Sequence, residues 1–422
     1  MHRVLIITYY WPPSSGAGVQ RWLKFAKYLP SFAWEPVILT IDPDYAAYPA
    51  IDETLEKEIS RETRIYKTPA IDYFRFYRKD KSKVPSAGFA TSDDSGFRAK
   101  FMRFIRGNFF IPDPRGGWNR YAFRKACEII ETEKIKHIIT TSPPHSTQLI
   151  GMKLRKRYPS LKWIADLRDP WTDIYYYSQF YHTLPAKAID RSLEKRVLRS
   201  ADQIITVGKT LRDLFVSKVP GTENKTTVIT NGYDEDDFRG LSPSIPDKLT
   251  ITYAGTLSGA YPLKGFLEAA GEYIKNKNAL SLRFVGTVSR AEKELIIEKA
   301  GLENVEFIPH VDHHAAIKYM LETTALLLII PDHQSGKSIL TGKLFEYIAS
   351  GKPVICIGPP DGDAAEIISI SKAGSAHGYN DIQGISEILN LLGRGERTRE
   401  KTDTIQFSRK VLTAKLAGLL EK

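Results

Sequence analysis

Short apolar runs alternate with helical patterns along almost the whole chain of 422 residues. In the first half, the strand-like runs lie at 4–8, 37–40, 137–141, 163–166, 203–207 and 227–230. Helical patterns separate them, for example at 21–29, 121–132 and 186–199. Nearly continuous apolar strands that alternate with helices predict a parallel sheet covered by helices on both faces.

The same alternation begins again near residue 248. Strand-like runs then lie at 250–254, 282–285, 305–308, 325–330 and 354–357. The segment before them, 234–248, is acidic and then rich in Pro and Ser, which is typical of a linker. Because the chain is also longer than one hydrophobic core usually organises, we predict two domains.

The predicted fold class is therefore α/β, with two doubly wound, Rossmann-like domains that face a cleft. The predicted parts are an N-terminal domain at 1–240, a C-terminal domain at 241–400 and a final segment, mostly helical, at 401–422. In open α/β sheets, ligands bind just beyond the carboxyl ends of the strands. We therefore expect the chemically active side chains in the segments that follow the predicted strands.

Net charge and cysteine content narrow the function classes. A formal charge of +11 favours an anionic partner, either a nucleotide, a membrane surface or nucleic acid. Cys127 and Cys356 have no metal-ligating neighbours in the sequence, so we expect both to be reduced, in a reducing compartment. The first residues lack the pattern of a secretory signal, and no run approaches the roughly 20 apolar residues that span a bilayer. These features predict a cytoplasmic protein that is soluble or peripheral on a membrane.

The stretch TGKLFEYIASGKPVI, at 341–355, joins a short helical pattern to an apolar strand. Lys343 and Glu346 lie three positions apart, so they share one face near the start of this helix. Backbone N–H groups and the helix dipole favour an anion at a helix start. The pair thus predicts a site for a phosphate and, one turn further, for a pair of hydroxyls, as a nucleotide sugar requires.

A glycine-rich loop, YYWPPSSGAGVQRW, follows the first predicted strand. Gly16 and Gly18 would let the backbone approach a phosphate closely. The nicotinamide-dinucleotide fingerprint requires a third glycine at the position of Arg21, so that interpretation is weak. The alternative to a phosphate loop is a turn that only starts a helix.

Two further predicted strands end in polar residues. His145 follows a Pro-Pro turn, which would fix the imidazole at the carboxyl edge of the sheet. Asp166 and Asp169 follow the next strand, in the segment WIADLRDPWTD, where carboxylates beside an aromatic ring suit a ligand rich in hydroxyls. We predict acceptor binding or acid–base work for one of these aspartates. An ordinary surface histidine and an Asp–Arg pair that closes the turn are the alternatives.

The segment LLLIIPDHQSGKS resembles the tail of a phosphate-binding loop of an ATPase. That motif requires a glycine where this chain has Pro331, so we do not predict an ATPase. Lys337 and Ser338 are predicted instead to line the site for the nucleotide sugar, which would be the donor of the sugar. The histidines near residue 313 could in principle hold a metal, but adjacent histidines rarely form a tetrahedral set, and no metal is predicted.

Taken in order, these motifs resemble glycosyltransferase family 4, a retaining family with the GT-B fold. The likeness includes the glycine loop, the histidine loop, the turn TNGYDEDDF at 230–238, the pair Lys264 and Gly265, and the helix of Glu346. This sequence has Ser338 where the family has the first of two glutamates, and Thr256 where it has an arginine.

The resemblance implies transfer of a hexose from a nucleotide-diphosphate sugar to a glycan or lipid-linked acceptor, with retention at the anomeric carbon. It implies no cofactor and no metal, since cations and helix N-termini stabilise the leaving diphosphate. Lys264 and Lys343 would then clamp the diphosphate, Glu346 would bind the ribose, and His145 would lie near the transferred sugar. The last helix would cross back onto the first domain.

Residues 74–106 contain nine Lys or Arg and three Asp. Within this segment Phe97, Phe101, Phe104 and Ile105 fall on one helical face, and Lys100, Arg103 and Arg106 fall on the other. This pattern fits an interfacial helix on an anionic membrane, and it fits equally a helix docked on its own domain. In the first case the protein would be peripheral on the inner face of the membrane. Members of the family often reach lipid-linked acceptors through such contacts.

Two other function classes stay open from the sequence. One is a different enzyme on the same fold, such as a nucleotide-sugar epimerase or a phosphorylase. The other is a non-catalytic basic protein that binds membrane or nucleic acid. We predict no nucleic-acid partner, because the glycines and carboxylates lie at strand ends and not along a basic stripe.

Overall fold

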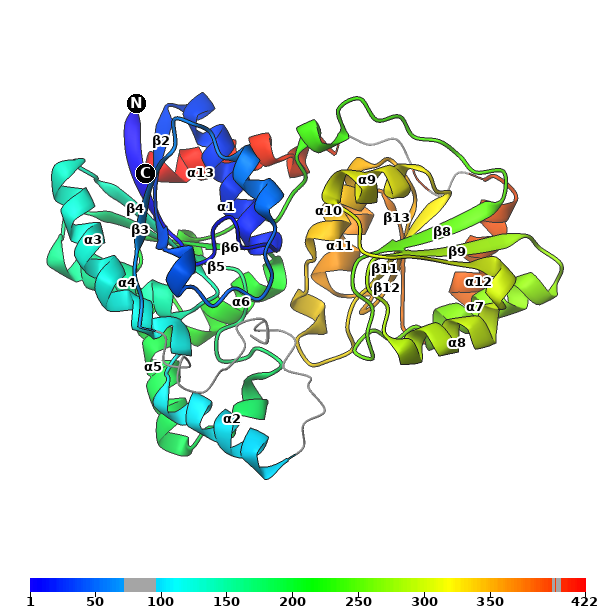
Figure 1. Cartoon of the computed structure of the whole chain (residues 1–422), viewed down its shortest axis with the longest axis horizontal. Helices are drawn as coiled ribbons and strands as arrows, with labels where there is room; N and C mark the ends of the chain where they lie inside the picture. Colours follow the sequence, from blue (N-terminus) through cyan, green and yellow to red (C-terminus); the bar gives the residue numbers. More distant parts are fainter. Residues whose placement is uncertain (72–95, 397–398, 400–403) are drawn as a thin grey trace. The chain divides into compact units, whose positions relative to one another are not determined.

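The computed structural model describes residues 1–71, 96–396, 399 and 404–422 (Figure 1). The chain forms two compact units, Met1–Thr230 together with Leu412–Lys422, and Asn231–Val411. The sequence predicts a domain boundary at residue 240, and in the structure the chain passes from the first unit to the second between Thr230 and Asn231. Most of the basic segment, up to residue 95, lies outside the described residues, so the structure bears on the interfacial-helix hypothesis only from residue 96 onward.

The first unit is built on a seven-stranded sheet in the order β3-β2-β1-β4-β5-β6-β7. All of its paired strands run parallel. The strands are β1 (His2–Ile7), β2 (Trp34–Ile41), β3 (Arg64–Thr68), β4 (His137–Ser142), β5 (Lys162–Leu167), β6 (Gln203–Thr206) and β7 (Thr226–Val228). The strand order reverses between β1 and β4, so the loops that follow these two strands diverge and leave room for a ligand.

Helices cover both faces of this sheet because successive strand side chains point to opposite sides. Leu5 and Ile7 pack into a core with α3, α4, α5 and α6, whereas Val4 and Ile6 pack with α1 and α13. Leu412 and Leu416, in the C-terminal helix α13, are buried in the same cluster as Val4. The helices are α1 (Ala17–Tyr28), α2 (Phe97–Phe109), α3 (Asn119–Thr132), α4 (Ser146–Arg157), α5 (Leu184–Ser200), α6 (Lys209–Lys218) and α13 (Arg409–Leu420).

The second unit repeats this plan with a six-stranded parallel sheet in the order β10-β9-β8-β11-β12-β13. Its strands are β8 (Leu249–Ala254), β9 (Leu280–Val285), β10 (Val305–Ile308), β11 (Ala325–Ile329), β12 (Val354–Ile357) and β13 (Gly374–His377). Its helices are α7 (Lys264–Lys275), α8 (Arg290–Ala300), α9 (His313–Leu321), α10 (Gly342–Ala349), α11 (Asp363–Ile370) and α12 (Ile382–Gly393). The strand order reverses between β8 and β11.

Both sheets have a fully buried centre. Buried side chains of α7, α8 and α12 pack on one face of the second sheet, and those of α9, α10 and α11 pack on the other. The predicted fold class, α/β with parallel doubly wound sheets, is therefore confirmed. No helix within the described ranges is long and apolar enough to cross a membrane.

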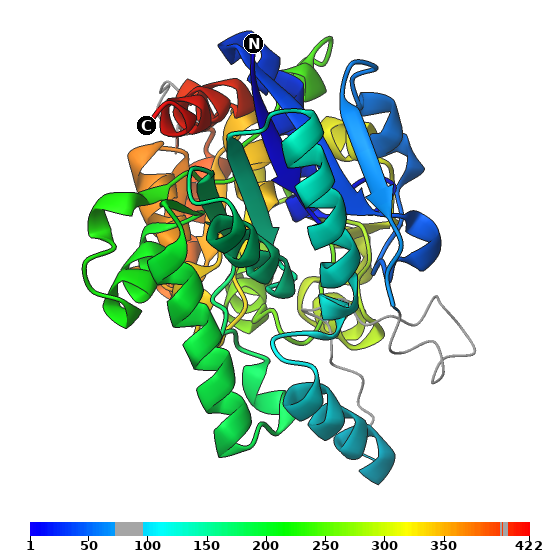
Figure 2. The same ribbon diagram turned by 90° about the vertical axis from the view of Figure 1, so that its left-hand side faces the viewer.

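Helix α2 lies at one end of the first unit, beside the start of α5 in both views (Figures 1 and 2). Its last turn is docked: the Asn108 side-chain amide donates to the Tyr181 carbonyl at 3.2 Å, and the Thr183 N–H donates to Asn108 Oδ1 at 2.8 Å. At Gly107, an added Cβ would lie 2.4 Å from the Phe180 carbonyl, so only glycine permits this approach. The C-terminal end of α2 is thus fixed to the domain.

Candidate functional site

A half-buried lysine, Lys343, marks the start of α10, beside the point where the second sheet reverses its strand order. The Lys343 ammonium donates to Tyr253 Oη at 3.1 Å and lies 4.4 Å from the centre of the Tyr253 ring. Gly255, at φ +126°, makes room for it, since an added Cβ would lie 2.6 Å from Lys343 Nζ. Burial lowers the pKa of Lys343 to about 8, and the nearby Glu346 carboxylate opposes this shift.

Glu346 lies one turn further along α10 and is only 15% exposed. Its Oε1 atom lies 3.1 Å from Nε2 of His313, the first residue of α9. On the neighbouring position of the helix, Tyr347 Oη accepts the Ala254 N–H at 2.9 Å. These contacts fix α10 against the end of β8 and hold the Glu346 carboxylate at the start of α9.

The N-terminus of α10 has no side-chain cap. Thr341 occupies the N-cap position, but its hydroxyl caps nothing and is buried without a hydrogen-bond partner in the described chain. A helix start leaves backbone N–H groups without intrahelical partners, and these groups attract anions. The helix start and Lys343 therefore form a site suited to a phosphate.

Three other residues that the sequence placed in the donor site make contacts of their own. Lys264 starts α7, is 76% exposed, and has Glu268 at 3.9 Å as its ion-pair partner. Lys337 pairs with Asp361 on the surface. Ser338 donates to the Ser335 carbonyl at 2.9 Å within a short 3-10 turn. The structure thus brings Lys343 and Glu346 together on α10. Lys264, Lys337 and Ser338 contact other residues instead.

The segment around His313 is explained by local structure. The Asp312 carboxylate accepts the Ala315 N–H at 2.8 Å and so caps α9. His313 contacts Glu346, as described above. Within the described ranges, no three His, Cys, Asp or Glu side chains gather as metal ligands would.

In the first unit, the glycine-rich loop ends at the start of α1. Gly16 has φ +113°, a left-handed conformation that favours glycine. At Gly18 an added Cβ would lie 2.0 Å from Nη1 of Arg168, so the Arg168 guanidinium covers this glycine. The group that approaches Gly18 closely in this structure is therefore an arginine that follows β5.

Asp166 is fully buried, and its carboxylate is enclosed by donors. Oδ1 accepts Arg21 Nη2 at 3.2 Å, and Oδ2 accepts Trp22 Nε1 at 2.9 Å and Thr141 Oγ1 at 2.8 Å. Arg21 is also fully buried and donates to the Thr230 carbonyl at 2.7 Å. These hydrogen bonds indicate that Asp166 holds α1 to the sheet. Because its carboxylate is fully enclosed, we do not assign it a contact with the substrate.

Asp169 differs from Asp166 because its side chain is only half-buried. Burial raises the pKa of Asp169, while the Arg168 charge opposes the rise. A carboxylate with a raised pKa at a strand end is suited to acid–base work. Of the two predicted aspartates, Asp169 is the one whose environment fits that role.

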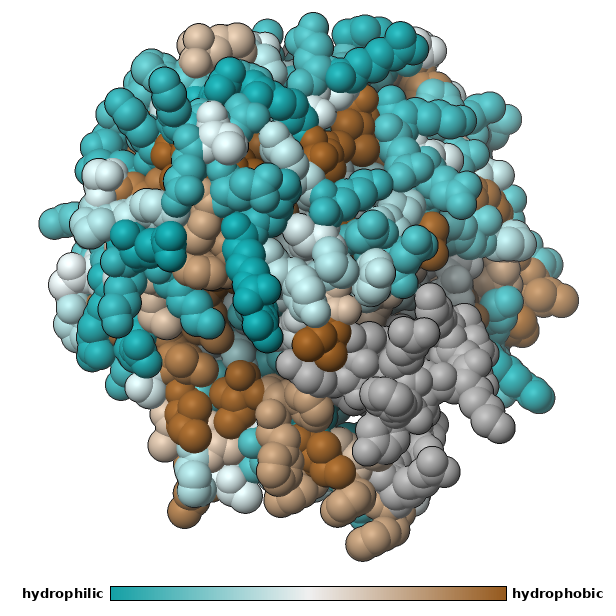
Figure 3. Space-filling view, turned by 60° about the vertical axis from the view of Figure 1, so that its left-hand side comes forward, coloured by the Kyte–Doolittle hydropathy of each residue, from teal (hydrophilic) through white to brown (hydrophobic). Residues whose placement is uncertain are grey.

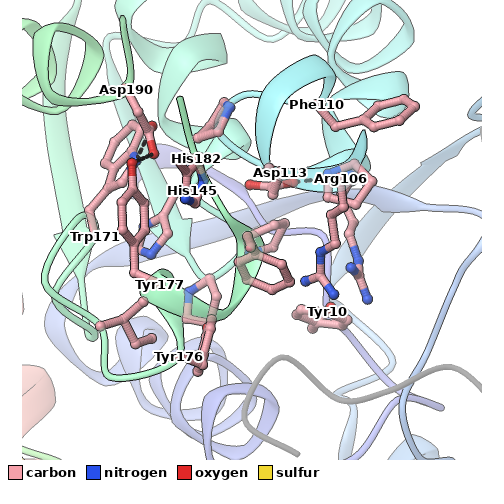
Figure 4. Close-up of a pocket in the computed structure, with 18 residues that line it drawn as sticks. Tyr10, Arg106, Phe110, Asp113, His145, Trp171, Tyr176, Tyr177, His182 and Asp190 are labelled. Carbon is pink, nitrogen blue, oxygen red and sulfur yellow. Dashed lines mark hydrogen bonds between the residues drawn. The ribbon is translucent and has the colours of Figure 1, made fainter. Parts of the chain in front are cut away.

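His145 lies in a pocket at the reversal of strand order in the first sheet (Figure 4). Its ring stacks on Trp171 with the centroids 4.9 Å apart. Both ring nitrogens are buried without a hydrogen-bond partner in the described chain, and burial lowers the pKa of His145 to about 3. The imidazole is therefore neutral at physiological pH and has both nitrogens free to bind a ligand.

Sequence reasoning missed most of the residues that surround His145. Tyr10, Arg106, Tyr176 and Asp190 line the same pocket, from the loop after β1, from α2, from the segment after β5 and from α5. The sequence pattern assigned Arg106 to the basic face of its helix, but the structure places it half-buried over the Phe180 ring. Asp190 accepts the Trp171 Nε1–H at 2.8 Å and the Tyr177 hydroxyl at 3.0 Å, and burial raises its pKa to about 6. No local motif links these segments, so only the folded chain reveals the pocket.

Two units that each contain a parallel doubly wound sheet are typical of the GT-B fold, and the second unit has a phosphate-type site at the start of α10. A sequence profile described as "Glycosyl transferases group 1" matches residues 234–408, and one described as "Glycosyltransferase Family 4" matches residues 87–237. The chain belongs to the group 1, or family 4, glycosyltransferases, and the predicted family is confirmed. No curated protein sequence matches the chain.

Solved structures support the same fold. HepE of Anabaena, crystallised with UDP, aligns with a TM-score of 0.63 at 13% identity and covers 99% of both chains. The lipopolysaccharide outer core galactosyltransferase WaaB, in its apo form, gives 0.62 at 13% identity over 99% of both chains. Sucrose-phosphate synthase of Thermosynechococcus elongatus gives 0.61 at 15% identity and covers 100% of this chain and 98% of its own. At these identities the likeness establishes the fold.

Proposed function

We propose that this glycosyltransferase moves a hexose from a nucleotide-diphosphate sugar to a glycan or lipid-linked acceptor, with retention and without a metal ion. The observation that carries the proposal is the arrangement at α10, where Lys343 and an uncapped helix start lie one turn from Glu346. A cation and free N–H groups suit a diphosphate, and a carboxylate suits the two hydroxyls of a ribose.

In the proposed complex, the diphosphate lies at the N-terminus of α10. Lys343 in its protonated form and the backbone N–H groups offset the negative charge that grows as the diphosphate leaves. Glu346 accepts hydrogen bonds from the ribose hydroxyls, while His313 holds the carboxylate in place. Lys264 remains a second proposed cation for the diphosphate, because it starts α7 and its side chain is free to move in solvent.

The transfer step exchanges two bonds at the anomeric carbon. The bond from this carbon to the diphosphate oxygen breaks, and the acceptor hydroxyl oxygen bonds to the same face. The hydroxyl proton passes to the departing diphosphate. His145, which is neutral, positions the transferred sugar by hydrogen bonds, and Asp169 is the proposed carboxylate on the acceptor side.

The donor-site proposal is tested by titrating the full chain with UDP, GDP and ADP and their sugars in a calorimeter. UDP is the first choice because HepE was crystallised with it. We expect Glu346→Gln to weaken nucleotide binding roughly tenfold or more, since a hydrogen bond to a charged group contributes about 1.5–3 kcal/mol. Glu294→Gln, an exposed glutamate paired with Arg290 on α8, is the matched control and should bind as the wild type does.

Turnover distinguishes transfer from the other enzymes of the same fold. With donor and acceptor together, we expect release of the nucleoside diphosphate and a glycosylated acceptor. Conversion of the nucleotide sugar to an epimer without any acceptor would identify an epimerase instead and would contradict the proposal. Equal nucleotide affinity in the wild type and in Glu346→Gln would remove the proposed ribose contact.

We also propose that the enzyme reaches its acceptor at an anionic membrane surface through α2. The docked last turn of α2 leaves Phe97, Phe101 and Phe109 exposed by 85%, 52% and 73%. Exposed apolar side chains at the start of α5 and in the turn before it, Tyr181 and Leu184, extend this surface. Figure 3 shows apolar side chains gathered at the lower end of the view, over α2 and the start of α5. A basic helix with protruding aromatic rings is suited to an anionic lipid surface.

A further inference from the structure

The pocket around His145 contains two arginines whose charges lie close together. Arg106 comes from α2, and Arg115 comes from the 3-10 turn Pro114–Trp118. The Arg106 guanidinium lies over the Phe180 ring, 4.2 Å from its centre. Burial and, to a smaller extent, the neighbouring Arg115 charge lower the pKa of Arg106 to about 10. For Arg115, burial acts in the same direction, but Tyr10, Tyr9 and Asp113 raise its pKa above the ordinary value. Like charges that lie close together repel each other, and a bound anion would stabilise both.

No carboxylate of the described chain forms an ion pair with either arginine. Nε and Nη2 of Arg115 are buried and have no hydrogen-bond partner in that part of the chain. Asp113, an acid that lines the same pocket, already accepts three hydrogen bonds. Its Oδ1 accepts the Arg115 backbone N–H at 2.9 Å and the Ser146 hydroxyl at 2.8 Å, and its Oδ2 accepts the Ser146 N–H at 2.7 Å. Asp113 therefore fixes the turn against α4 and leaves donors of Arg115 unsatisfied.

The two ends of the pocket differ in charge. Arg106 and Tyr10 lie at one end, and Trp171, Tyr177 and Asp190 lie at the other, as Figure 4 shows. Asp190 is held at its end by Trp171 and Tyr177, so it is turned to the far wall. Asp113 also lies beside Arg106, so the end with the two arginines and this one carboxylate is a recess of net positive charge with aromatic walls.

The size of the cavity limits what can enter. Its volume is about 60 Å³, and one water needs about 10–15 Å³ on this scale. The enclosed space suits a group of roughly the size of a phosphate, and a sugar ring would lie at its open mouth. Guanidinium groups bind phosphate oxygens through paired N–H donors, and the Tyr10 hydroxyl adds a further hydrogen-bonding group.

We propose that this recess binds a phosphate group of the acceptor, so that the acceptor is a phosphorylated sugar or a sugar joined through phosphate to a lipid. This inference rests on the proposed transferase function and names its acceptor class. A phosphate held by Arg106 and Arg115 anchors the acceptor in the pocket of His145. The acceptor is thereby oriented by its charge before its hydroxyl reaches the donor.

The test uses calorimetry on the full chain with inorganic phosphate and with hexose 6-phosphate, and the uncharged hexose serves as the ligand control. We expect Arg106→Gln to weaken binding of both phosphates roughly tenfold or more. Arg196→Gln, an exposed arginine on α5 outside the pocket, is the matched control and should bind as the wild type does. Arg106→Lys keeps the charge and should retain part of the affinity, which separates lost charge from lost packing over Phe180.

Two arms distinguish the sources of the phosphate. Saturable binding of hexose 6-phosphate that depends on Arg106 indicates a soluble phosphorylated acceptor. Binding that depends on Arg106 only with vesicles containing phosphatidic acid indicates a lipid phosphate. Equal phosphate affinity in the wild type, Arg106→Gln and Arg196→Gln, in solution and on vesicles, would overturn the inference.

A UDP titration in the same experiment keeps the two proposals apart. Phosphate binding that depends on Arg106, without any nucleotide binding, would support the recess and contradict the donor proposal. Nucleotide binding that depends on Glu346, with no effect of Arg106 on phosphate, would support the donor proposal and contradict the recess.

Discussion

Single residues in this enzyme divide into those that hold the fold and those that are poised for a ligand. Asp166 and Arg21 form a fully buried ion pair, in which each remaining polar atom of the carboxylate is also used. His145 is also buried, and Lys343 and Arg115 are half-buried. Both ring nitrogens of His145 and two guanidinium nitrogens of Arg115 have no hydrogen-bond partner in the described protein, and the Lys343 ammonium donates to a tyrosine hydroxyl without an ion pair to a carboxylate of that part of the chain. We infer that a ligand binds to the polar groups of these three residues.

Replacing Asp166 with Ala should therefore destabilise the protein. The substitution leaves the Arg21 guanidinium buried without its carboxylate, which costs about 3–5 kcal/mol in the free energy of unfolding. Urea unfolding measures the loss. Asp213→Ala, which removes an exposed partner of Arg212, should change stability by less than about 1 kcal/mol. An Asp166→Ala protein of normal stability and no activity would show that the carboxylate acts directly in catalysis.

Lys343 should give nucleotide binding a pH dependence. The pKa of Lys343 in the folded chain, about 8, lies below the ordinary value of 10.5. Between pH 8 and 10.5 the unfolded chain therefore binds more protons than the folded chain, so the contribution of Lys343 to stability rises with pH. Nucleotide affinity should show the opposite trend, because the diphosphate binds the protonated amine. We expect affinity for UDP to fall above pH 8 by up to about tenfold per pH unit.

Calorimetry at pH 7, 8 and 9 checks this prediction. Lys343→Met should bind UDP weakly at every pH and should lose the slope. A slope that survives in Lys343→Met would assign the titration to another group.

At the scale of helices and loops, close contacts explain two glycines that a sequence pattern alone assigns to a ligand. Gly18, in α1, lies under Arg168, and Gly255, after β8, lies beside Lys343. The side chain that needs the space comes in each case from an element distant in the sequence. The phosphate-loop interpretation of Gly18 remains a prediction, but the structure gives this glycine a packing reason as well.

Gly18→Ala should thus destabilise the protein although alanine favours helices. The added Cβ meets Arg168 Nη1 at 2.0 Å, so the guanidinium must move; because it is the end of a flexible side chain, we expect a cost of only about 1 kcal/mol. Gly418→Ala, in helix α13 with no atom within 4 Å of the added Cβ, should be neutral or stabilising. Thermal unfolding of the two variants makes the comparison. Equal stability would mean that Arg168 moves freely.

The exposed face of α2 gives a prediction for membranes. Replacing both Phe97 and Phe101 by Ser should lower affinity for vesicles of anionic lipid by roughly tenfold or more. The substitutions remove the two aromatic rings that would be buried in the interfacial region of the membrane. Thermal stability should change little, since Phe97 is 85% and Phe101 is 52% exposed. Leu302→Ser, which removes an equally exposed apolar residue from the second unit, is the control for vesicle co-sedimentation. Unchanged binding of the double variant would assign α2 a purely structural role.

At the scale of the whole molecule, the sequence predicted the parallel α/β plan well because buried strands are apolar throughout. It missed β3 and β13, whose sequences RIYKT and GSAH contain few apolar residues and which pair at sheet edges. It also located the helix of Lys343 and Glu346, since both residues belong to one local pattern.

The rest of the site depends on contacts that no local pattern encodes. Asp166 was predicted to meet substrate, but its partner Arg21 lies 145 residues away in the sequence, and only the fold shows that the pair is buried. The recess with Arg106 and Arg115 combines segments near residues 10, 106–115, 143–145 and 171–190. Side chains from such separate segments gain a common role only when the sheet brings its strand ends together.

The proposed transferase function depends above all on a nucleoside diphosphate binding at the start of α10. Amide hydrogen exchange of the full chain, with and without UDP, reports on that helix start itself. We expect slower exchange in 341–346 and in the segment 253–256 when UDP is bound, and no such protection in Lys343→Met at the same nucleotide concentration. Bound UDP that leaves exchange in 341–346 unchanged would contradict the proposed donor site.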